Sequence, residues 1–285
     1  MNRLFRSLRF GPAPRLDGSG QPALPGRCNV CGRRTQFLYS DPALYRESLN
    51  CVHCRTTSRY RSIASGLLEA FRRLAGVRAK SLAQLPRALR GRRLALYDTQ
   101  VPFDTGASAY PIPTLLERCE WLDLSVSTWK PERPPGEALG PRTTNQNLER
   151  LTFADASFDI VLTSDVMEHV RLEQLAHREV RRVLKEGGVY LFTVPHFRDR
   201  ETIERVKIVD PADPSRDVDV LPREYHGDAN AQDGRALSYR SFGVDLDEKL
   251  QRLGFQIEYT KQDAAEKGIL NTELFFCTVA RVRAT

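Results

Sequence analysis

The segment from Phe158 to Pro195 constrains the fold of this chain more than any other feature. It begins with a short apolar run, Phe158–Thr163, which is typical of a strand buried on both faces of a parallel sheet. Polar and ionisable residues follow this run at once, namely Ser164, Asp165, Glu168 and His169. Because reactive groups usually gather at the carboxyl ends of strands in an α/β fold, these residues are candidates for a functional site.

A helix and a second strand are expected after this run. Apolar residues recur at helical spacing between Leu172 and Leu184, and charged residues fill the other face. Glycine can adopt the left-handed conformation of a helix C-cap, so the pair Gly187 and Gly188 predicts the end of the helix. The run Val189–Val194 predicts the next buried strand, which completes a right-handed strand–helix–strand unit.

As a whole, this pattern resembles the class I S-adenosylmethionine (SAM)-dependent methyltransferases. The resemblance lies in FDIVLTSDVMEHV at Phe158–Val170 and LKEGGVYLFTVP at Leu184–Pro195, which join the acidic end of a fourth strand to the glycine pair before a fifth. It extends, with declining clarity, over Leu94 to Val282. It implies an α/β fold with a Rossmann-like methyltransferase sheet, mostly parallel with a C-terminal antiparallel hairpin. A Rossmann-like unit of another function is the alternative.

The other elements are expected in the order that this family has. Further strands are expected at Leu94–Tyr97, Trp121–Leu124, the few residues before Asn147, Phe255–Tyr259 and Leu274–Val282. A helical stripe from Phe242 to Leu253, ended by Gly254, precedes the last two strands.

The resemblance also implies a set of cofactor-binding residues. Asp98, Thr99 and Gln100 would border the methionine part of SAM, and Asp123 would hold the ribose hydroxyls. Asn147 would meet the adenine amine while Leu148 packs on the ring, and Ser164 and Asp165 would close the site. As alternatives, Asp98 and Asp123 cap the next helix and Asn147 sits in a turn. The loop after the first strand departs from the family, because Gly106 is its one glycine.

Two residues are the first candidates for catalysis. His169 titrates near neutral pH and lies close to the end of the fourth strand, and Glu168 precedes it. His196 and His226 follow as candidates for a base. A structural role is the alternative for His169, because a histidine that opens a helix often binds backbone and orients the turn.

Four cysteines predict a zinc site. Cys28-x-x-Cys31 and Cys51-x-x-Cys54 are separated by 19 residues, and two such turns can offer four thiolates to one structural ion. Gly32 suits the first turn, because the position favours a positive φ. Disulfides and a redox motif are the alternatives.

The remaining cysteines and the nearby histidine have simpler interpretations. His53 lies inside the second turn and can replace a cysteine as ligand, although four thiolates already satisfy the metal. Cys119 and Cys277 lie in apolar surroundings and are expected in the core.

Composition suggests how the chain is organised. We expect a flexible basic leader over residues 1–26, a zinc ribbon over 27–60, an amphipathic helix and linker over 61–91, and the methyltransferase-like domain over 92–285, with a polar insertion at about 210–235. Residues 1–95 hold 19 Lys and Arg against 4 Asp and Glu, so RNA or another anionic partner is possible there. A general excess of arginine explains this charge equally well.

These observations favour a cytoplasmic SAM-dependent methyltransferase with a structural zinc ribbon. Its acceptor is not identified, and a small molecule, a glycan-type acceptor or RNA are all compatible with the resemblance. A non-catalytic interaction protein with the same fold is the main alternative. A nicotinamide-dependent oxidoreductase is disfavoured, since no G-x-G-x-x-G follows the first strand. No apolar run approaches the roughly 18 residues of a membrane-spanning helix.

Overall fold

The computed structural model describes residues 15–16, 22–39, 46–227 and 234–280. Its centre is a seven-stranded sheet in the order β18-β19-β11-β10-β5-β8-β9. Within it, β19 runs antiparallel to both neighbours and the other pairs are parallel. The strands are β5 (Leu94–Asp98), β8 (Leu122–Thr128), β9 (Thr143–Asn145), β10 (Phe158–Ser164), β11 (Leu184–Thr193), β18 (Phe255–Ala264) and β19 (Ile269–Val279). The predicted Rossmann-like sheet, mostly parallel with a C-terminal antiparallel hairpin, is confirmed.

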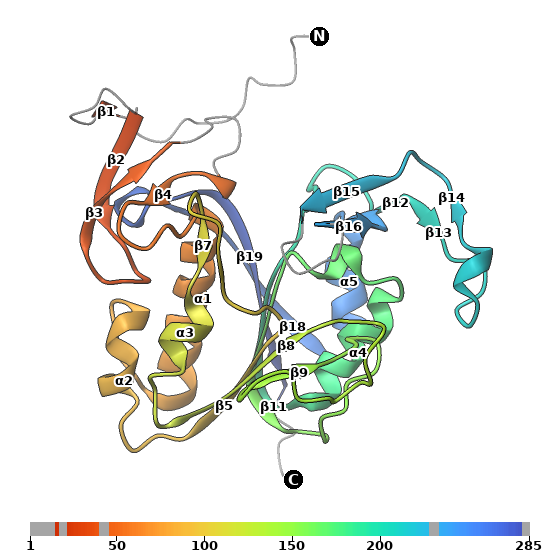
Figure 1. The fold of residues 1–285 in the computed structure, drawn as a ribbon, viewed down its shortest axis with the longest axis horizontal. Coiled ribbons are helices and arrows are strands. Elements are labelled where there is room, and N and C mark those ends of the chain that lie inside the picture. The colour runs from red at the N-terminus through yellow and green to blue at the C-terminus, as the bar shows by residue number, and fades with distance from the viewer. Residues whose placement is uncertain (1–14, 17–21, 40–45, 228–233, 281–285) are drawn as a thin grey trace.

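Helices cover both faces of this sheet (Figure 1). One face carries α1 (Ser58–Ala75), α2 (Leu85–Ala88) and α3 (Ile112–Leu116). The other carries α4 (Glu173–Val183) and α5 (Asp245–Arg252). Each face of the sheet packs against its helices in a separate hydrophobic cluster, and successive strand residues point to opposite faces. Leu191 therefore packs under α1, whereas Tyr190 and Phe192 pack with α4 and α5. This double burial explains why the central strands are continuously apolar.

The helix α1 packs tightly on the sheet because it contains a glycine. A Cβ atom on Gly66 would lie 2.5 Å from Cδ2 of Leu274 in β19. The helix ends at Gly76, whose φ of 62° is left-handed and whose N–H donates to the carbonyl oxygens of Arg72 and Phe71. Thus α1 belongs to the packing of the main sheet as much as to the connection before it.

The glycine pair has a different position from the predicted one. The helix α4 ends at Val183, and β11 begins at Leu184, so Gly187 and Gly188 lie inside the strand. The register with β10 shifts there, and Gly187 has a φ of 73°. A Cβ on Gly188 would lie 2.8 Å from the carbonyl oxygen of Lys185. The expected C-cap was therefore wrong, and the glycines instead permit a bulge in β11.

The cysteine module forms a separate four-stranded antiparallel sheet. Its strands are β1 (Arg15–Leu16), β2 (Pro22–Arg27), β3 (Arg34–Leu38) and β4 (Asn50–Cys51). Residues 15–16 and 22–26 are thus in strands, although they were expected in a flexible leader; the rest of that leader lies outside the described residues. Phe37 and Leu49 join the same hydrophobic cluster as α1. The domain boundaries themselves stay predictions.

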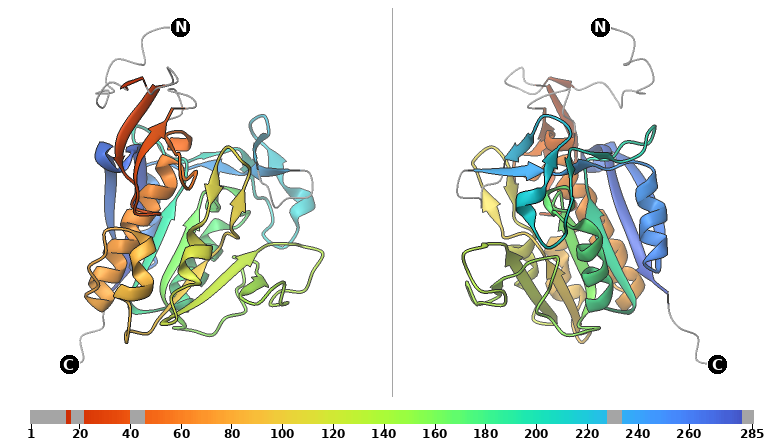
Figure 2. Two further views of the ribbon diagram at one scale, coloured as in Figure 1. Left: turned by 60° about the vertical axis from the view of Figure 1, so that its left-hand side comes forward. Right: turned by 90° about the vertical axis from the view of Figure 1, so that its right-hand side faces the viewer.

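Short elements surround the carboxyl ends of the parallel strands. Two-stranded antiparallel sheets are formed by β6 (Phe103–Asp104) with β7 (Ala109–Tyr110), β12 (Ile203–Glu204) with β17 (Arg240–Ser241), β13 (Val206–Lys207) with β14 (Val218–Asp219), and β15 (Glu224–Gly227) with β16 (Arg235–Ser238). Short 3-10 helices occupy Leu82–Gln84, Met167–His169, Pro214–Arg216 and Ala265–Lys267. Figure 2 shows the cysteine module and the segment from β12 to β17 at the same end of the sheet.

The described part of the insertion at about 210–235 is bound to the segment between β10 and α4. The guanidinium of Arg171 donates to the carboxylate of Asp217 at 2.6 Å and to the carbonyl oxygens of Asp210 and Pro211. In the described part of the chain, no helix is both long enough and apolar enough to cross a membrane. A cytoplasmic location stays a prediction.

Candidate functional site

A cavity of about 1240 Å³ lies at the carboxyl ends of the strands β5, β8, β9 and β10. Single small ligands usually occupy pockets of about 300–1,000 Å³, so this cavity has room for two of them side by side. Most of the predicted site residues line it: Thr99, Gln100, Asn147, Leu148, Ser164, Asp165 and His169. The sequence prediction that these residues converge is therefore supported by their positions, while their roles stay predictions.

Asp98 lies behind the cavity and does not line it. Its carboxylate is buried, accepts a 2.7 Å hydrogen bond from the hydroxyl of Tyr110 and accepts another from the backbone N–H of Gln100. Burial raises the pKa of this carboxyl to about 7, although both hydrogen bonds act in the opposite direction. Asp98 thus shapes the loop after β5 from beneath.

Asp123 was expected at the carboxyl end of the second strand, and this placement is wrong. The strand β8 continues to Thr128, four residues past its expected end at Leu124. Asp123 is its second residue, is exposed and lies 3.3 Å from Arg93. The end of β8 instead presents Ser127, Thr128 and Trp129 to the cavity.

The segment after β9 partly follows the alternative interpretation. The side-chain oxygen of Asn147 accepts a 2.9 Å hydrogen bond from the backbone N–H of Glu149, as in an Asx turn. Leu148 is largely buried and lines the cavity as an apolar surface. Glu149 also lines it and accepts a hydrogen bond from the backbone of Leu172. The turn occupies one acceptor position of the Asn147 oxygen and leaves its second lone pair.

The cysteine module and the start of α1 each contribute an arginine to the end of β10. Arg46 donates two hydrogen bonds of 2.5 Å to the carboxylate of Asp165, which also accepts from the hydroxyl of Thr193. Arg59, in the first turn of α1, donates to the hydroxyl of Ser164 and to Glu47. Although burial opposes it, the two guanidinium groups hold the pKa of Asp165 well below its usual range. Asp165 is consequently a fixed anion.

Sequence reasoning missed these arginines and Trp129. Arg59 directly follows the second cysteine turn, but a basic residue at a helix start does not indicate which sheet edge the helix will approach. Trp129 was missed because β8 was expected to end before it. An apolar ring next to a strand end would have been a usable signal once the strand was correctly placed.

The catalytic candidates meet at the side of the cavity nearest β15. Glu168 and His169 lie in the 3-10 helix after β10, and His226 comes from β15. His169 Nε2 lies 3.2 Å from His226 Nδ1, and Glu168 Oε1 lies 3.8 Å from each of these nitrogens. The Glu168 carboxylate is fully buried, and burial raises its pKa well above the usual range. His196 does not line this cavity and contacts Gly243 and Glu273 instead.

The four predicted cysteines converge at one point. Cys28 and Cys54 have their Sγ atoms 3.7 Å apart, and Cys31 and Cys51 have theirs 4.0 Å apart. These distances exclude disulfides, whose sulfur atoms lie about 2.05 Å apart, and they match a tetrahedron of thiolates at about 2.3 Å from one ion. The turn after Cys28 uses the positive φ of Gly32, as predicted.

The other predictions about cysteines and His53 can also be compared with the structure. Cys119 and Cys277 are buried, as expected for core residues. His53 lies apart from the sulfur cluster, with its Nε2 3.2 Å from the carbonyl oxygen of Arg34.

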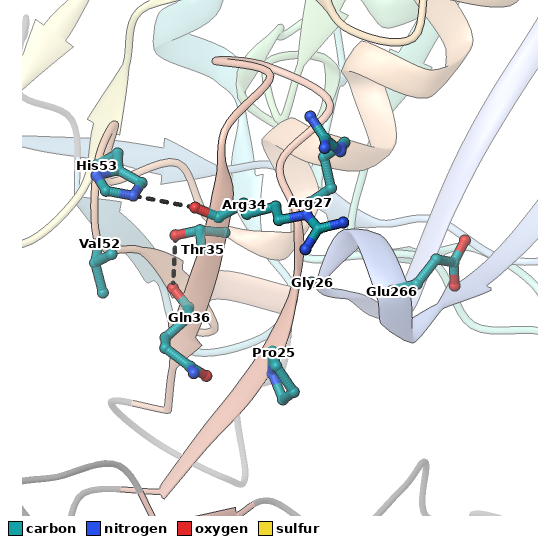
Figure 3. Close-up of a pocket in the computed structure, with 9 residues that line it drawn as sticks. All are labelled: Pro25, Gly26, Arg27, Arg34, Thr35, Gln36, Val52, His53 and Glu266. Carbon is teal, nitrogen blue, oxygen red and sulfur yellow. Dashed lines mark hydrogen bonds between the residues drawn. The ribbon is translucent and has the colours of Figure 1, made fainter.

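A shallow hollow lies on the outer side of the cysteine module. Figure 3 shows Arg27, Arg34 and His53 from the module around it, with Glu266 from the turn between β18 and β19. Arg27 donates to the carbonyl oxygen of Gly32, so part of its charge is held within the module. The hollow therefore combines charges of both signs and does not form a uniformly basic surface.

A family model matches the part of the chain that holds most of these strand ends. Residues 108–192, which include β8, β9, β10 and most of β11, match the family model described as "Methyltransferase domain". This segment is similar to a methyltransferase domain. It covers the carboxyl ends of three of the four strands that surround the cavity.

One curated relative matches a short part of the chain. The dimethylglycine N-methyltransferase of Parasynechococcus marenigrum (strain WH8102) is 34% identical over 77 residues. The match covers 25% of this chain and 28% of that enzyme. The chain thus corresponds to little more than a quarter of this relative's length.

Solved structures resemble this chain at low sequence identity. The YcgJ protein from Bacillus subtilis is 14% identical, with 70% of this chain and 98% of that chain covered and a TM-score of 0.41. The 1,6-didemethyltoxoflavin-N1-methyltransferase of Burkholderia thailandensis, solved with S-adenosylhomocysteine (SAH), is 13% identical, with 95% and 100% covered and a TM-score of 0.36. Because these TM-scores are low, the fold is assigned from the strand order and register described above and not from these structures. Neither these names nor the family description mentions nucleic acid, so an RNA or anionic partner stays a prediction.

Proposed function

We propose that this chain is a SAM-dependent methyltransferase whose donor and acceptor occupy the cavity at the ends of β5, β8, β9 and β10. The observation that carries the proposal is the position of this cavity at the carboxyl edge of a Rossmann-like sheet, where three of the four surrounding strand ends belong to the segment that matches the methyltransferase model. Ligands of open α/β sheets bind at this edge. The acceptor itself is not identified.

The loop after β5 offers polar groups for the methionine end of the donor. Thr99 Oγ1 and Gln100 Oε1 are buried and have no hydrogen-bond partner among the described residues, and both side chains line the cavity. Buried polar atoms usually find partners, so these two favour a bound ligand. Gly106 is exposed and is not among the residues that line the cavity, and its φ of 81° instead suits the turn between β6 and β7.

The other end of the cavity suits an adenosine group. Leu148 and the half-exposed Trp129 provide apolar surface for the base. Thr128 offers a hydroxyl where the family usually has a carboxylate, which predicts fewer bonds to the ribose.

SAM would supply an electrophilic methyl group. The chain's own task is to align an acceptor with that group and to exclude water, and the walls from both the cysteine module and the β15–β16 hairpin contribute to this. A proton from a hydroxyl or ammonium acceptor needs a destination. The group formed by Glu168, His169 and His226 lies at the cavity, next to the place where that proton would be released.

Calorimetric titration with SAM and SAH tests this proposal. We expect saturable binding of both. In Trp129→Ala the affinity for SAH should fall by about tenfold or more, since stacking of a base on an aromatic ring contributes about 1–3 kcal/mol. Trp121→Phe is the matched control, because Trp121 does not line the cavity. Absence of binding at millimolar cofactor would refute the enzyme and favour a non-catalytic interaction protein.

We further propose that Cys28, Cys31, Cys51 and Cys54 hold a structural zinc ion. A closed set of four thiolates leaves no open position for a substrate. Beneath it lies Arg61, a fully buried cation that donates to the carbonyl oxygens of Thr56, Leu49 and Gly268. Its positive charge offsets the net negative charge of such a cluster. Less than about one zinc per freshly purified chain would refute this site.

A further inference from the structure

The side chains of Glu168, His169 and His226 form a compact group of three donors. One donor atom from each lies within 4.8 Å of the others. The closest pair is His169 Nε2 and His226 Nδ1, 3.2 Å apart, and Glu168 Oε1 lies 3.8 Å from both. The two histidines line the cavity, whereas Glu168 is completely buried behind them.

The outer nitrogens of both rings are already bonded, which fixes their protons. His169 Nδ1 lies 2.9 Å from the carbonyl oxygen of Leu237, which can only accept, so this nitrogen carries the proton. His226 Nε2 lies 3.1 Å from the carboxylate of Glu224, which places its proton there. In the neutral rings, the two inner nitrogens then direct lone pairs at each other. A cation between them would remove this repulsion.

A bound cation would also stabilise the buried Glu168 carboxylate. Neither of its oxygens accepts a hydrogen bond from another described residue. Its ion-pair partners within the described residues are the two histidines, since Arg46 and Arg59 are directed at Asp165 and Glu47. A buried carboxylate without hydrogen bonds is costly, and coordination of a metal is one of the few arrangements that stabilise it.

We propose that Glu168, His169 and His226 bind a divalent transition-metal ion. Bonds of about 2.0–2.1 Å to a tetrahedral ion would place the donors about 3.3 Å apart, close to the separations observed. Two imidazoles favour a transition metal over magnesium or calcium. The contacts of His169 with Leu237 and of His226 with Glu224 are the outer hydrogen bonds that metal-binding histidines usually make.

Three protein ligands leave a coordination position open toward the cavity. If the proposed methyltransferase function holds, on which this step rests, that position would receive an oxygen of the acceptor, so we infer a hydroxyl acceptor. The metal favours loss of the hydroxyl proton to solvent. The oxygen lone pair then forms the bond to the methyl carbon while the carbon–sulfur bond breaks, and its electrons remain on sulfur. His169 acts here as a ligand and not as the base.

Metal content tests the site without any SAM. The chain is dialysed against buffered micromolar Zn²⁺, and bound zinc is measured by mass spectrometry. We expect wild type to hold one more zinc per chain than Glu168→Gln or His226→Asn. Glu224→Gln keeps all three ligands and should weaken this zinc by about 10–100-fold, as loss of an outer hydrogen bond does. His53→Asn is the matched control and should keep the wild-type content, since His53 lies outside the group.

Equal zinc content in wild type and Glu168→Gln would overturn the proposal. Because a variant can unfold, Co²⁺ is also added to wild type whose cysteines are already loaded with Zn²⁺. Ligation by nitrogen and oxygen predicts visible d–d absorption without a thiolate-to-cobalt charge-transfer band, and the absence of that absorption would also overturn the site. SAH binding, measured separately, tells whether the methyltransferase proposal fails with it.

Discussion

Arg46 and Asp165 form a two-pronged ion pair in which each guanidinium nitrogen lies 2.5 Å from a carboxylate oxygen. The two residues are 119 positions apart, one in the cysteine module and the other at the end of β10. The pair therefore ties the module to the edge of the main sheet where the cavity opens. Because both side chains line that cavity, a change in the structure of the module should alter the shape and charge of the cavity.

Removal of this arginine should destabilise the fold. Arg46→Met leaves Asp165 with the hydroxyl of Thr193 and a 3.4 Å contact to Arg59. Since both partners are only partly exposed, we expect the free energy of unfolding to fall by about 2–4 kcal/mol, somewhat less than for a fully buried pair. Urea unfolding measures it.

The matched control is Arg55→Met, which breaks an ion pair with Asp104. Both of these side chains are about half exposed, at 47% and 46%. Exposed pairs contribute about 0–1 kcal/mol, so the loss should be small. Equal losses in the two variants would contradict the structural role of Arg46.

Removal of zinc should loosen both the module and the cavity. Phe37 and Leu49 of the module share a hydrophobic cluster with α1, and Arg46 and Arg59 line the cavity. A chelator should therefore lower the melting temperature and weaken SAH binding, and added Zn²⁺ should restore both. Differential scanning fluorimetry and calorimetry measure the two effects. Cys31→Ser should behave like chelation, whereas Cys119→Ser, outside the cluster, should keep its zinc.

The fold was more predictable than the site, for physical reasons. The strand β10 was placed almost to the residue, because burial on both faces leaves a continuous apolar signal that ends where the strand does. The strand β8 runs past its apolar part into Ser127 and Thr128, so its end, and with it the role given to Asp123, was misplaced. Strand ends decide which side chains reach a site at the carboxyl edge.

Contacts between distant segments could not be predicted in this way. Nothing in the local sequence joins Arg46 to Asp165, or His226 to His169, because these pairs depend on how the cysteine module and the β15–β16 hairpin pack on the sheet. The cysteines were an exception. Their spacing specifies a common ligand, and the four Sγ atoms do converge.

Asp98 should make stability depend on pH. Its pKa is about 7 in the fold against 3.8 for an ordinary aspartate, so between these values the folded state keeps a proton that the unfolded state has lost. The free energy of unfolding therefore falls as pH rises through this window. From pH 5 to 7.5 we expect about 2.5 kcal/mol more loss in wild type than in Asp98→Asn.

Urea unfolding at several pH values measures this slope. Tyr110→Phe removes a hydrogen bond that lowers the pKa of Asp98, so it should move the window to higher pH. Identical slopes for wild type and Asp98→Asn would show that Asp98 is ionised in the fold.

A substitution at Gly66 tests whether helix propensity or core packing has the larger effect on stability. In the interior of a solvated helix, Gly→Ala stabilises by about 0.8–1.0 kcal/mol. Here the new methyl group would lie 2.5 Å from Cδ2 of Leu274 and 3.2 Å from Cδ2 of Leu191, in the closed core between α1 and the sheet. Overpacking of this kind costs about 1–3 kcal/mol, so we expect Gly66→Ala to be destabilising overall. The double variant Gly66→Ala with Leu274→Val, which trims the contacted side chain, should recover part of the loss relative to Leu274→Val alone. Chemical denaturation of the four proteins gives the coupling between the two positions, and a value near zero would mean that α1 does not depend on this close approach.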